Sequence, residues 1–142
     1  MTVQKKAKRP VILFLEDEPL HFKAIAKALR WKGYSCLRRG TIKIPELEEL
    51  VQAWHPKRVV LDVWLSTSPR QAEEWGTTFV KPARDADPNL RVVVYSQKAE
   101  DQGQIDFVAK SWRAHKGIVK RTVNGRITPA EARRIADEIL SA

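Results

Sequence analysis

The stretch "VVLDVWLS" at residues 59–66 places an aspartate directly after three apolar residues, in a run typical of a strand buried on both faces. An unpaired carboxylate inside a core is strongly unfavourable unless it takes up a proton. We therefore expect Asp62 to lie where this strand leaves the core. In open α/β sheets, that edge is where functional sites are found.

Similar short runs rich in β-branched residues occur elsewhere along the chain. They are "VILFL" (11–15), "VVVY" (92–95), "IV" (118–119) and a weaker one, "YSCL" (34–37). Helical patterns alternate with them, over residues 19–33, 44–54, 73–86, 100–114 and 128–140. This alternation implies right-handed crossovers between parallel strands. The sequence therefore predicts a three-layer α/β domain, with helices on both faces of a five-stranded parallel sheet.

Several residues predict where the helices begin and end. Gly33 is expected to cap the first helix, and Pro82 to kink or shorten the helix at 73–86. Thr128, Pro129 and Glu131 form the pattern of a capping box at the start of the last helix. The tryptophans at helix positions are expected to serve core or interface packing: Trp31, Trp54 and Trp112.

Length and composition limit the classes of protein. The 142 residues, 43% of them hydrophobic, suit one globular domain. The single cysteine, Cys36, excludes an internal disulfide and a Cys-based zinc cluster, which suits a reducing compartment such as the cytoplasm. The apolar run at 11–15 is too short for a signal peptide or a membrane span, and acidic residues follow it.

The formal net charge of +9 makes an acidic partner or nucleic acid worth considering. The basic residues are scattered, however, and no zinc finger, basic zipper or stacked-aromatic motif organises them. A solvated basic surface with a basic tail is the favoured explanation. Nucleic-acid binding is kept as an alternative.

Polar residues follow four of the five predicted strands. They are Glu16 and Asp17 after the first, Asp62 in the third, Ser96 after the fourth and Lys120 after the fifth. Because parallel strands end at one edge, we expect these side chains to converge. Three carboxylates in one place repel one another unless a cation joins them, and their oxygens suit Mg²⁺.

Such a site could transfer a phosphoryl group. Asp62 stands alone at its strand end and is the best nucleophile, while Lys120 and Ser96 could bind the oxygens of the transferred group. A hydrolase with an aspartate nucleophile is less favoured, because Trp64 stands where it would need a second acid. A dinucleotide enzyme is disfavoured because no glycine-rich motif follows residues 11–15.

The ordered set of motifs resembles the receiver domain of two-component response regulators. The matching stretches are "VILFLEDEPL", "VVLDVWLS", "VVVYS" and "GIVKR". The resemblance implies a flavodoxin-like (βα)5 receiver domain over residues 11–142, after a basic tail at 1–10. It also implies phosphorylation on Asp62, with self-catalysed transfer and dephosphorylation as the only enzymatic activity.

The resemblance assigns a role to each site residue. Glu16, Asp17, Asp62 and the backbone carbonyl of Trp64 would hold Mg²⁺. Ser96 would sense the phosphoryl group and Lys120 would pair with it. The histidines, by contrast, lack metal-ligand spacing and are expected at the surface or its boundary: His21, His55 and His115.

The sequence also departs from the family pattern. Arg121 replaces the usual proline, Gly117 occupies the place of the aromatic switch residue, and Gln97 stands where a small residue is usual. An insertion beside the site, residues 63–75, contains "STSPRQAEEW" and could act as a lid or docking surface. A second, around Asn124 and Gly125, predicts a tight hairpin before the last helix.

The leading hypothesis is therefore a stand-alone receiver. A sensor histidine kinase or phosphotransfer protein would phosphorylate Asp62, and the signal would pass to a downstream protein or through a homodimer. One alternative is a degenerate receiver that acts as a phosphorylation-independent interaction module. The other is the nucleic-acid-binding protein suggested by the net charge.

Overall fold

The computed structural model describes residues 9–40, 43–62, 80–96 and 101–142. These residues form five parallel strands in the order β2-β1-β3-β4-β5. The strands are β1 (Val11–Leu15), β2 (Ser35–Arg39), β3 (Arg58–Asp62), β4 (Arg91–Ser96) and β5 (Lys116–Val119). The prediction of a five-stranded parallel sheet is confirmed. The weak run at 34–37 is β2, an edge strand whose half-buried residues explain its weaker apolar pattern.

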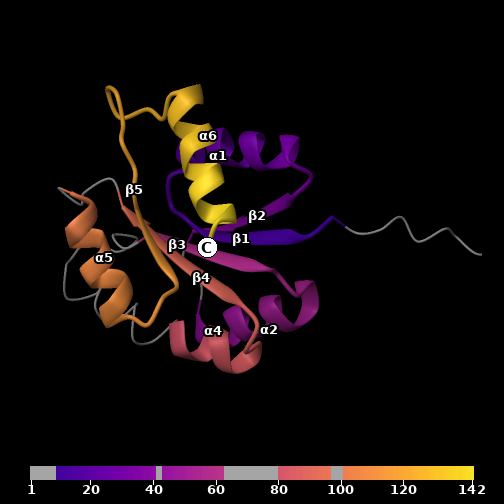
Figure 1. Ribbon diagram of the computed structural model, residues 1–142. Helices are drawn as coiled ribbons and strands as arrows, with labels where there is room; N and C mark the ends of the chain where they lie inside the picture. Colours follow the sequence, from indigo (N-terminus) through magenta and orange to yellow (C-terminus); the bar gives the residue numbers. More distant parts are fainter. Residues whose placement is uncertain (1–8, 41–42, 63–79, 97–100) are drawn as a thin grey trace, which may run out of the picture.

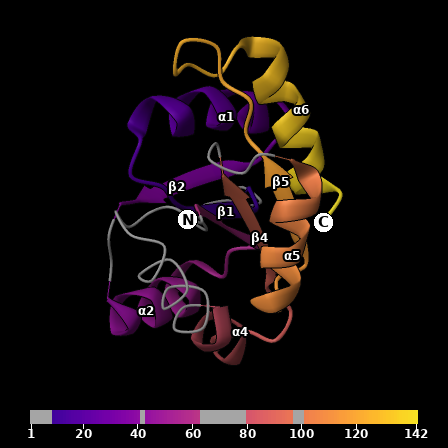
Figure 2. The ribbon, with the colours of Figure 1, turned by 90° about the vertical axis from the view of Figure 1, so that its left-hand side faces the viewer.

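In the described ranges, five helices cover the two faces of the sheet (Figures 1 and 2). On one face lie α1 (Pro19–Trp31) and α6 (Pro129–Leu140). On the other lie α2 (Ile44–Trp54), α4 (Lys81–Ala86) and α5 (Gln102–Ser111). The three-layer prediction is therefore confirmed, and none of the described helices has the length and apolarity that crossing a bilayer requires.

Alternate residues of each strand supply two separate cores, as expected for strands buried on both faces. In β1, Leu13 and Leu15 face the α2, α4 and α5 layer, whereas Ile12 and Phe14 face α1 and α6. The α1 and α6 core is buried almost completely, and it consists of Ile12, Phe14, Ile25, Leu29, Val60, Val93, Tyr95, Ile118, Ile135, Ala136 and Ile139.

Most of the predicted helix ends are confirmed. Gly33 follows α1 with φ of 92°, and Thr128 Oγ1 accepts a hydrogen bond from Glu131 N at 3.2 Å. Asn124 and Gly125 form the tight turn, with φ values of 52° and 75°. Pro82 lies in the first turn of α4 as described, so its effect on a longer helix stays a prediction. Residues 73–79 lie outside the described part of the chain.

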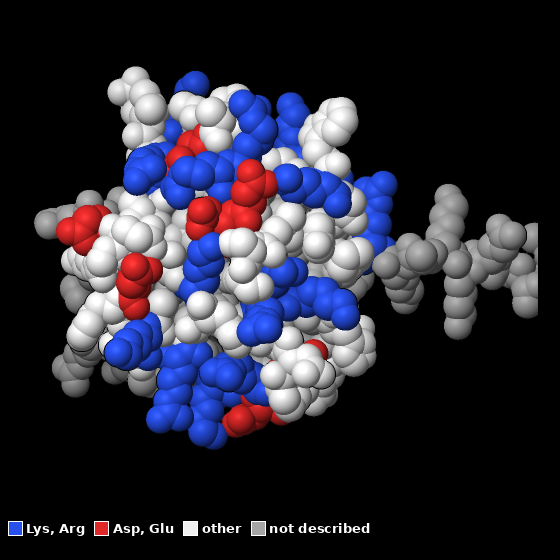
Figure 3. Space-filling model, viewed as in Figure 1, with Lys and Arg blue, Asp and Glu red and all other residues white. Residues whose placement is uncertain are grey.

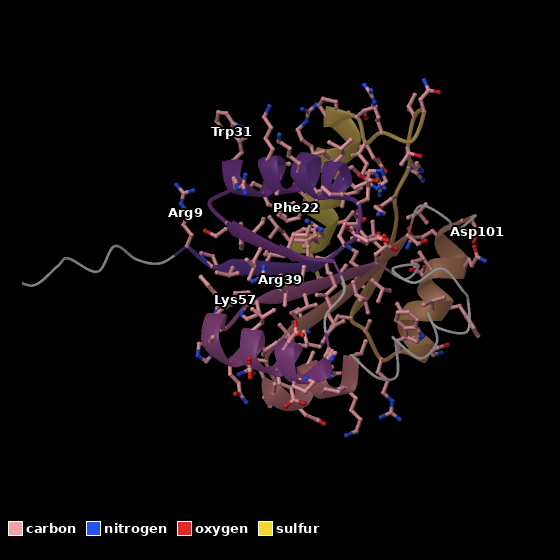
Figure 4. The ribbon with its side chains drawn as sticks, turned by 180° about the vertical axis from the view of Figure 1, so that it is seen from behind. Arg9, Phe22, Trp31, Arg39, Lys57 and Asp101 are labelled. Carbon is pink, nitrogen blue, oxygen red and sulfur yellow. The ribbon has the colours of Figure 1, made fainter. Side chains whose placement is uncertain are left out.

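Of the two roles expected for the tryptophans, core packing is confirmed for one of the three, and interface packing stays a prediction for the other two. Trp112 is buried beneath α5, but Trp31 and Trp54 have exposed fractions of 84% and 54%. Figure 4 shows why for α1: Phe22 lies between the helix and the sheet, and Trp31 projects from the outer surface. Trp31 is therefore available to a partner rather than to the core.

Candidate functional site

The three predicted carboxylates meet at the carboxyl edge of the sheet. Glu16 and Asp17 follow β1, and Asp62 is the last residue of the adjacent β3. One ligand oxygen of each lies within 4.8 Å of the others. Glu16 is fully buried and Asp62 nearly so, whereas Asp17 is exposed and opens the cluster to solvent. Their chemistry and spacing suit a hard divalent cation.

Lys120 provides the positive charge of this cluster. It follows β5 with its side chain only 1% exposed, and its Nζ lies 3.0 Å from Glu16 Oε2 and 3.2 Å from Asp62 Oδ2. Burial of these charges is tolerable only because they are paired and hydrogen-bonded. The ammonium therefore bridges Glu16 and the predicted phosphoacceptor, Asp62.

The pKa of Glu16 is raised from its usual 4.5 to about 7. Burial is the largest cause, because it disfavours the charged form; nearby Lys120 lowers the pKa and the negative charge of Asp62 raises it. Glu16 Oε1 also accepts a hydrogen bond from Glu18 N at 3.0 Å. Among the described residues, the site thus places three carboxylates beside one buried lysine.

This shift predicts a pH dependence of stability. The folded-state pKa of Glu16 is the higher one, so the unfolded chain loses this proton first as the pH rises. In EDTA, we expect the free energy of unfolding to fall by roughly 3 kcal/mol between the two pKa values, 4.5 and about 7. Denaturant unfolding across this pH range measures the effect.

Glu16→Gln removes the titrating group, and the exposed residue Glu48 on α2 provides a matched control in Glu48→Gln. The difference in stability between wild type and Glu16→Gln should change across the window, whereas the difference for Glu48→Gln should stay constant. If the free energy of unfolding depended on pH in the same way in wild type and Glu16→Gln, the assignment of this titration to Glu16 would be wrong.

Tyr95 is a member of the site that the sequence analysis missed. It pairs with Asp62 in the register of β3 and β4, is fully buried, and lies under Lys120, with Nζ 4.2 Å from the ring centroid. Burial raises the pKa of its phenol well above the usual value, and the negative charge of Glu16 adds to this. Its hydroxyl is near enough to lower the pKa of Glu16, yet it forms no hydrogen bond of standard geometry among the described residues.

His21 corrects another expectation, because it is buried rather than at the surface. It is 3% exposed in the first turns of α1, with Nδ1 3.4 Å from Lys120 Nζ and Nε2 2.8 Å from the carbonyl oxygen of Gly125. A carbonyl only accepts, so Nε2 carries the proton and Nδ1 accepts from the ammonium. The three donors of Lys120 thus meet Glu16, Asp62 and His21.

Ser96 occupies the expected place at the end of β4 and is fully buried. Its carbonyl oxygen accepts a hydrogen bond from Lys120 N at 2.9 Å, which ties the ends of β4 and β5 together. The contact of its hydroxyl with a phosphoryl group stays a prediction. Gln97, Trp64 and the insertion at 63–75 lie outside the described residues.

The two described departures from the receiver pattern have structural reasons. Arg121 N donates a hydrogen bond to Glu131 Oε2 at 2.7 Å, which a proline could not do. Glu131 therefore serves the loop after β5, in place of the reciprocal contact expected of a capping box. At Gly117, an added Cβ would lie 2.7 Å from the carbonyl oxygen of Ile105. The close approach of α5 leaves no room for an aromatic ring there.

This close approach predicts that Gly117→Ala is destabilising. Because the clashing atom belongs to backbone, we expect a loss of about 1–3 kcal/mol, measured by denaturant unfolding. Gly103→Ala, in the helix that packs there, is the matched control. Its Cβ would meet nothing closer than 3.4 Å, so stability should be unchanged or rise by up to about 1 kcal/mol. Equal effects would mean that the packing at Gly117 is looser than described.

No protein-family model matches the chain, and no curated protein matches it by sequence. Solved structures do match its fold. A response regulator from Thermotoga maritima has a TM-score of 0.69 and 16% identity, over 95% of this chain and 100% of that chain. A CheY-like receiver domain protein from Methanospirillum hungatei has a TM-score of 0.66 and 15% identity, over 94% and 93%.

A third similar structure contains ligands. It is a response regulator protein from Burkholderia pseudomallei with a phosphorylated aspartic acid, a calcium ion and citrate. Its TM-score is 0.61 at 18% identity, over 93% of this chain and 74% of that chain. These similarities show that the chain has the flavodoxin-like fold of response regulator receiver domains.

Proposed function

We propose that residues 11–142 form a receiver domain that accepts a phosphoryl group on Asp62 with Mg²⁺ present. The donor would be a sensor histidine kinase or a phosphotransfer protein, and the readout would be contact with a downstream protein. One observation carries this proposal: in a receiver fold, three carboxylates and Lys120 converge at one edge of the sheet. We expect the protein to act in the cytoplasm.

The donor set fits a divalent ion. Glu16, Asp17 and Asp62 offer hard oxygen ligands close together, and in the described part of the chain one lysine pairs with the two that are buried. Bound there, Mg²⁺ would offset the charge of the incoming phosphoryl oxygens. The similar Burkholderia pseudomallei protein has both a calcium ion and a phosphorylated aspartic acid, which supports this assignment. A further ligand would be the carbonyl of Trp64.

The chemistry then requires two further roles from the chain itself. A carboxylate oxygen of Asp62 attacks phosphorus and forms the acyl phosphate, while the bond from phosphorus to the donor breaks and the leaving group keeps the electron pair. Lys120, already 3.2 Å from Asp62 Oδ2, would bind a phosphoryl oxygen. The hydroxyl of Ser96 would bind another. Dephosphorylation would follow by attack of water.

A small phosphodonor tests this proposal without the unidentified kinase. Wild-type protein incubated with acetyl phosphate and Mg²⁺ should gain the mass of one phosphoryl group, and EDTA should prevent the gain. Hydroxylamine should remove the group, as it does with acyl phosphates. No gain in mass with Mg²⁺ would contradict phosphorylation at this site.

That negative result would favour a second function, a degenerate receiver that binds its partners without phosphorylation. A specific observation keeps it open. Gly117 has no side chain to rotate, and α5 fills the space that an aromatic ring would need. A signal from Lys120 cannot therefore use a ring at position 117.

A further inference from the structure

A groove runs between α1 and α6 on the outer surface, away from the carboxylate site. It encloses about 530 Å³ and has a floor of small apolar residues, Ala24, Ala28, Ile127, Pro129 and Ala132. Trp31 lines both this groove and a second hollow of about 330 Å³. An indole that is 84% exposed beside an apolar groove is typical of a binding surface rather than of a solvated face.

The rim of the groove is basic. Helix α1 contains no acidic residue, and Lys27, Arg30 and Arg133 take part in no ion pair within the described ranges. The acidic residues of α6 are already paired, for example Asp137 with Lys32 at 2.7 Å. Figure 3 shows Lys and Arg side chains over the upper part of the molecule, where α1 and α6 lie. Lys32, which also lines the groove, is thus paired, whereas the other three basic residues lack a negative partner among the described residues.

We propose that this groove docks an acidic segment of a partner protein, which inserts an apolar side chain beside Trp31. Charge complementarity selects this occupant. A second copy with a net charge of +9 would be repelled, and the N-terminal residues 1–8 contain lysines but no acid. The phosphates of a nucleic acid would pair with the basic side chains of the rim, but nothing apolar would fill the floor of the groove.

The structure also connects the groove to the carboxylate site. His21 accepts from Lys120 on one side and donates to Gly125 on the other, at 3.4 and 2.8 Å. Gly125 lies in the hairpin that leads directly into Ile127 and Pro129, which line the groove. This path lies on the α1 and α6 face of the sheet. The opposite face is where α5 packs against Gly117 and leaves no room for a side chain.

The coupling rests on the proposed function, whereas the docking does not. When Lys120 turns to a phosphoryl oxygen, it no longer holds His21 Nδ1, and the imidazole can shift together with the hairpin carbonyl of Gly125 that it binds. Ile127 and Pro129 can then adjust to the inserted side chain, so the acidic segment binds more tightly. His21 is thus a positioning residue between the two sites.

The docking is tested on the unmodified, full-length protein. The probe is a fluorescent helical peptide with glutamates on one face and leucines and a tryptophan on the other. Trp31→Ala should weaken its binding at least about tenfold, and Lys27→Glu or Arg133→Glu by about threefold to tenfold, less so at high salt. Fluorescence anisotropy measures these affinities.

Two matched variants lie outside the groove. Trp54→Ala removes another exposed indole on α2, and Lys110→Glu reverses a charge on α5; both should bind the peptide like wild type. Equal losses in the groove and control variants would overturn the docking proposal, since they indicate only general attraction to a basic protein. Tighter binding of duplex DNA than of the peptide, reduced by the same groove variants, would overturn it in favour of nucleic acid.

The coupling is tested with beryllofluoride and Mg²⁺, which mimic the phosphoryl group. We expect peptide affinity to rise at least about threefold in wild type and to stay constant in His21→Phe, which keeps an aromatic ring but loses both hydrogen bonds. If beryllofluoride binds and wild-type affinity does not change, the coupling is wrong. If beryllofluoride does not bind at all, the proposed phosphoacceptor function fails, and the peptide result still decides the docking.

Discussion

Asp62→Asn is expected to lose phosphorylation by acetyl phosphate completely while the protein remains folded. The amide cannot serve as the nucleophile, so no acyl phosphate forms. Lys120 keeps its ion pair with Glu16, and one of three crowded negative charges is removed. We therefore expect the stability of Asp62→Asn to equal or exceed that of wild type, and the pKa of Glu16 to fall below its value of about 7.

Intact-mass measurement after incubation reports the label, and thermal unfolding reports the fold. Asp85→Asn is a suitable control, because Asp85 is an exposed aspartate paired with Lys81 on α4. It should be phosphorylated to the same extent as wild type. Labelling that survives in Asp62→Asn would place the acceptor elsewhere. If the variant is unfolded at the assay temperature, the labelling of both proteins is compared at a lower temperature at which the variant is folded.

The second large effect is expected for Lys120→Met. This change leaves Glu16 and Asp62 buried without their shared counter-charge. Removing one partner of a buried ion pair costs about 3–5 kcal/mol, and we expect a loss of roughly 3 kcal/mol in EDTA. The lower value follows because Glu16 can take up a proton when the lysine is gone. Mg²⁺ should restore part of the lost stability by binding the folded state.

Lys116→Met, at the first residue of β5, provides the comparison. Lys116 pairs with Glu138 at 2.7 Å, but its side chain is 27% exposed and that of Glu138 is 42% exposed. Partly exposed ion pairs contribute little, so its loss should be within about 1 kcal/mol and independent of Mg²⁺. A Lys120→Met protein as stable as Lys116→Met would show that the carboxylates do not depend on the lysine.

The sequence predicted the fold well because its signals are local and redundant. The apolar runs, Gly33, Thr128 and the Asn124 and Gly125 turn each have one common structural meaning, and all of them agree with a parallel sheet. The convergence of Glu16, Asp17 and Asp62 followed from topology alone, since parallel strands end at one edge. The detailed pairing of Lys120 with two carboxylates needed the coordinates.

The members of the site that escaped prediction are those whose residue type is misleading. His21 lies four residues before the buried Ile25, a spacing that indicates the buried face of α1, but a histidine is more often placed at a surface. Tyr95 alternates with Val93 and so faces α1 and α6. Trp31 follows Lys27 by four residues, a spacing that indicates the solvent face of α1. The large indole nevertheless suggested packing against the core or a partner.

Gly117 and Arg121 show a different limit. A glycine in a strand and an arginine after it are ordinary in sequence, and only the three-dimensional neighbours explain them. Ile105 of α5 approaches the strand too closely for any side chain, and Glu131 of α6 requires an N–H at position 121. Contacts between residues far apart in sequence leave no local signal, so these roles could not be inferred beforehand.

The central claim is that Asp62 is a phosphoacceptor beside a divalent ion held by Glu16 and Asp17. The most direct test is a crystal structure of the protein grown with Mg²⁺ and beryllofluoride. The account predicts beryllium bonded to a carboxylate oxygen of Asp62, Mg²⁺ bound to Glu16, Asp17 and Asp62, and Lys120 turned from its carboxylate partners to a fluorine. An unmodified Asp62 at saturating beryllofluoride, or Mg²⁺ bound away from these three carboxylates, would contradict it.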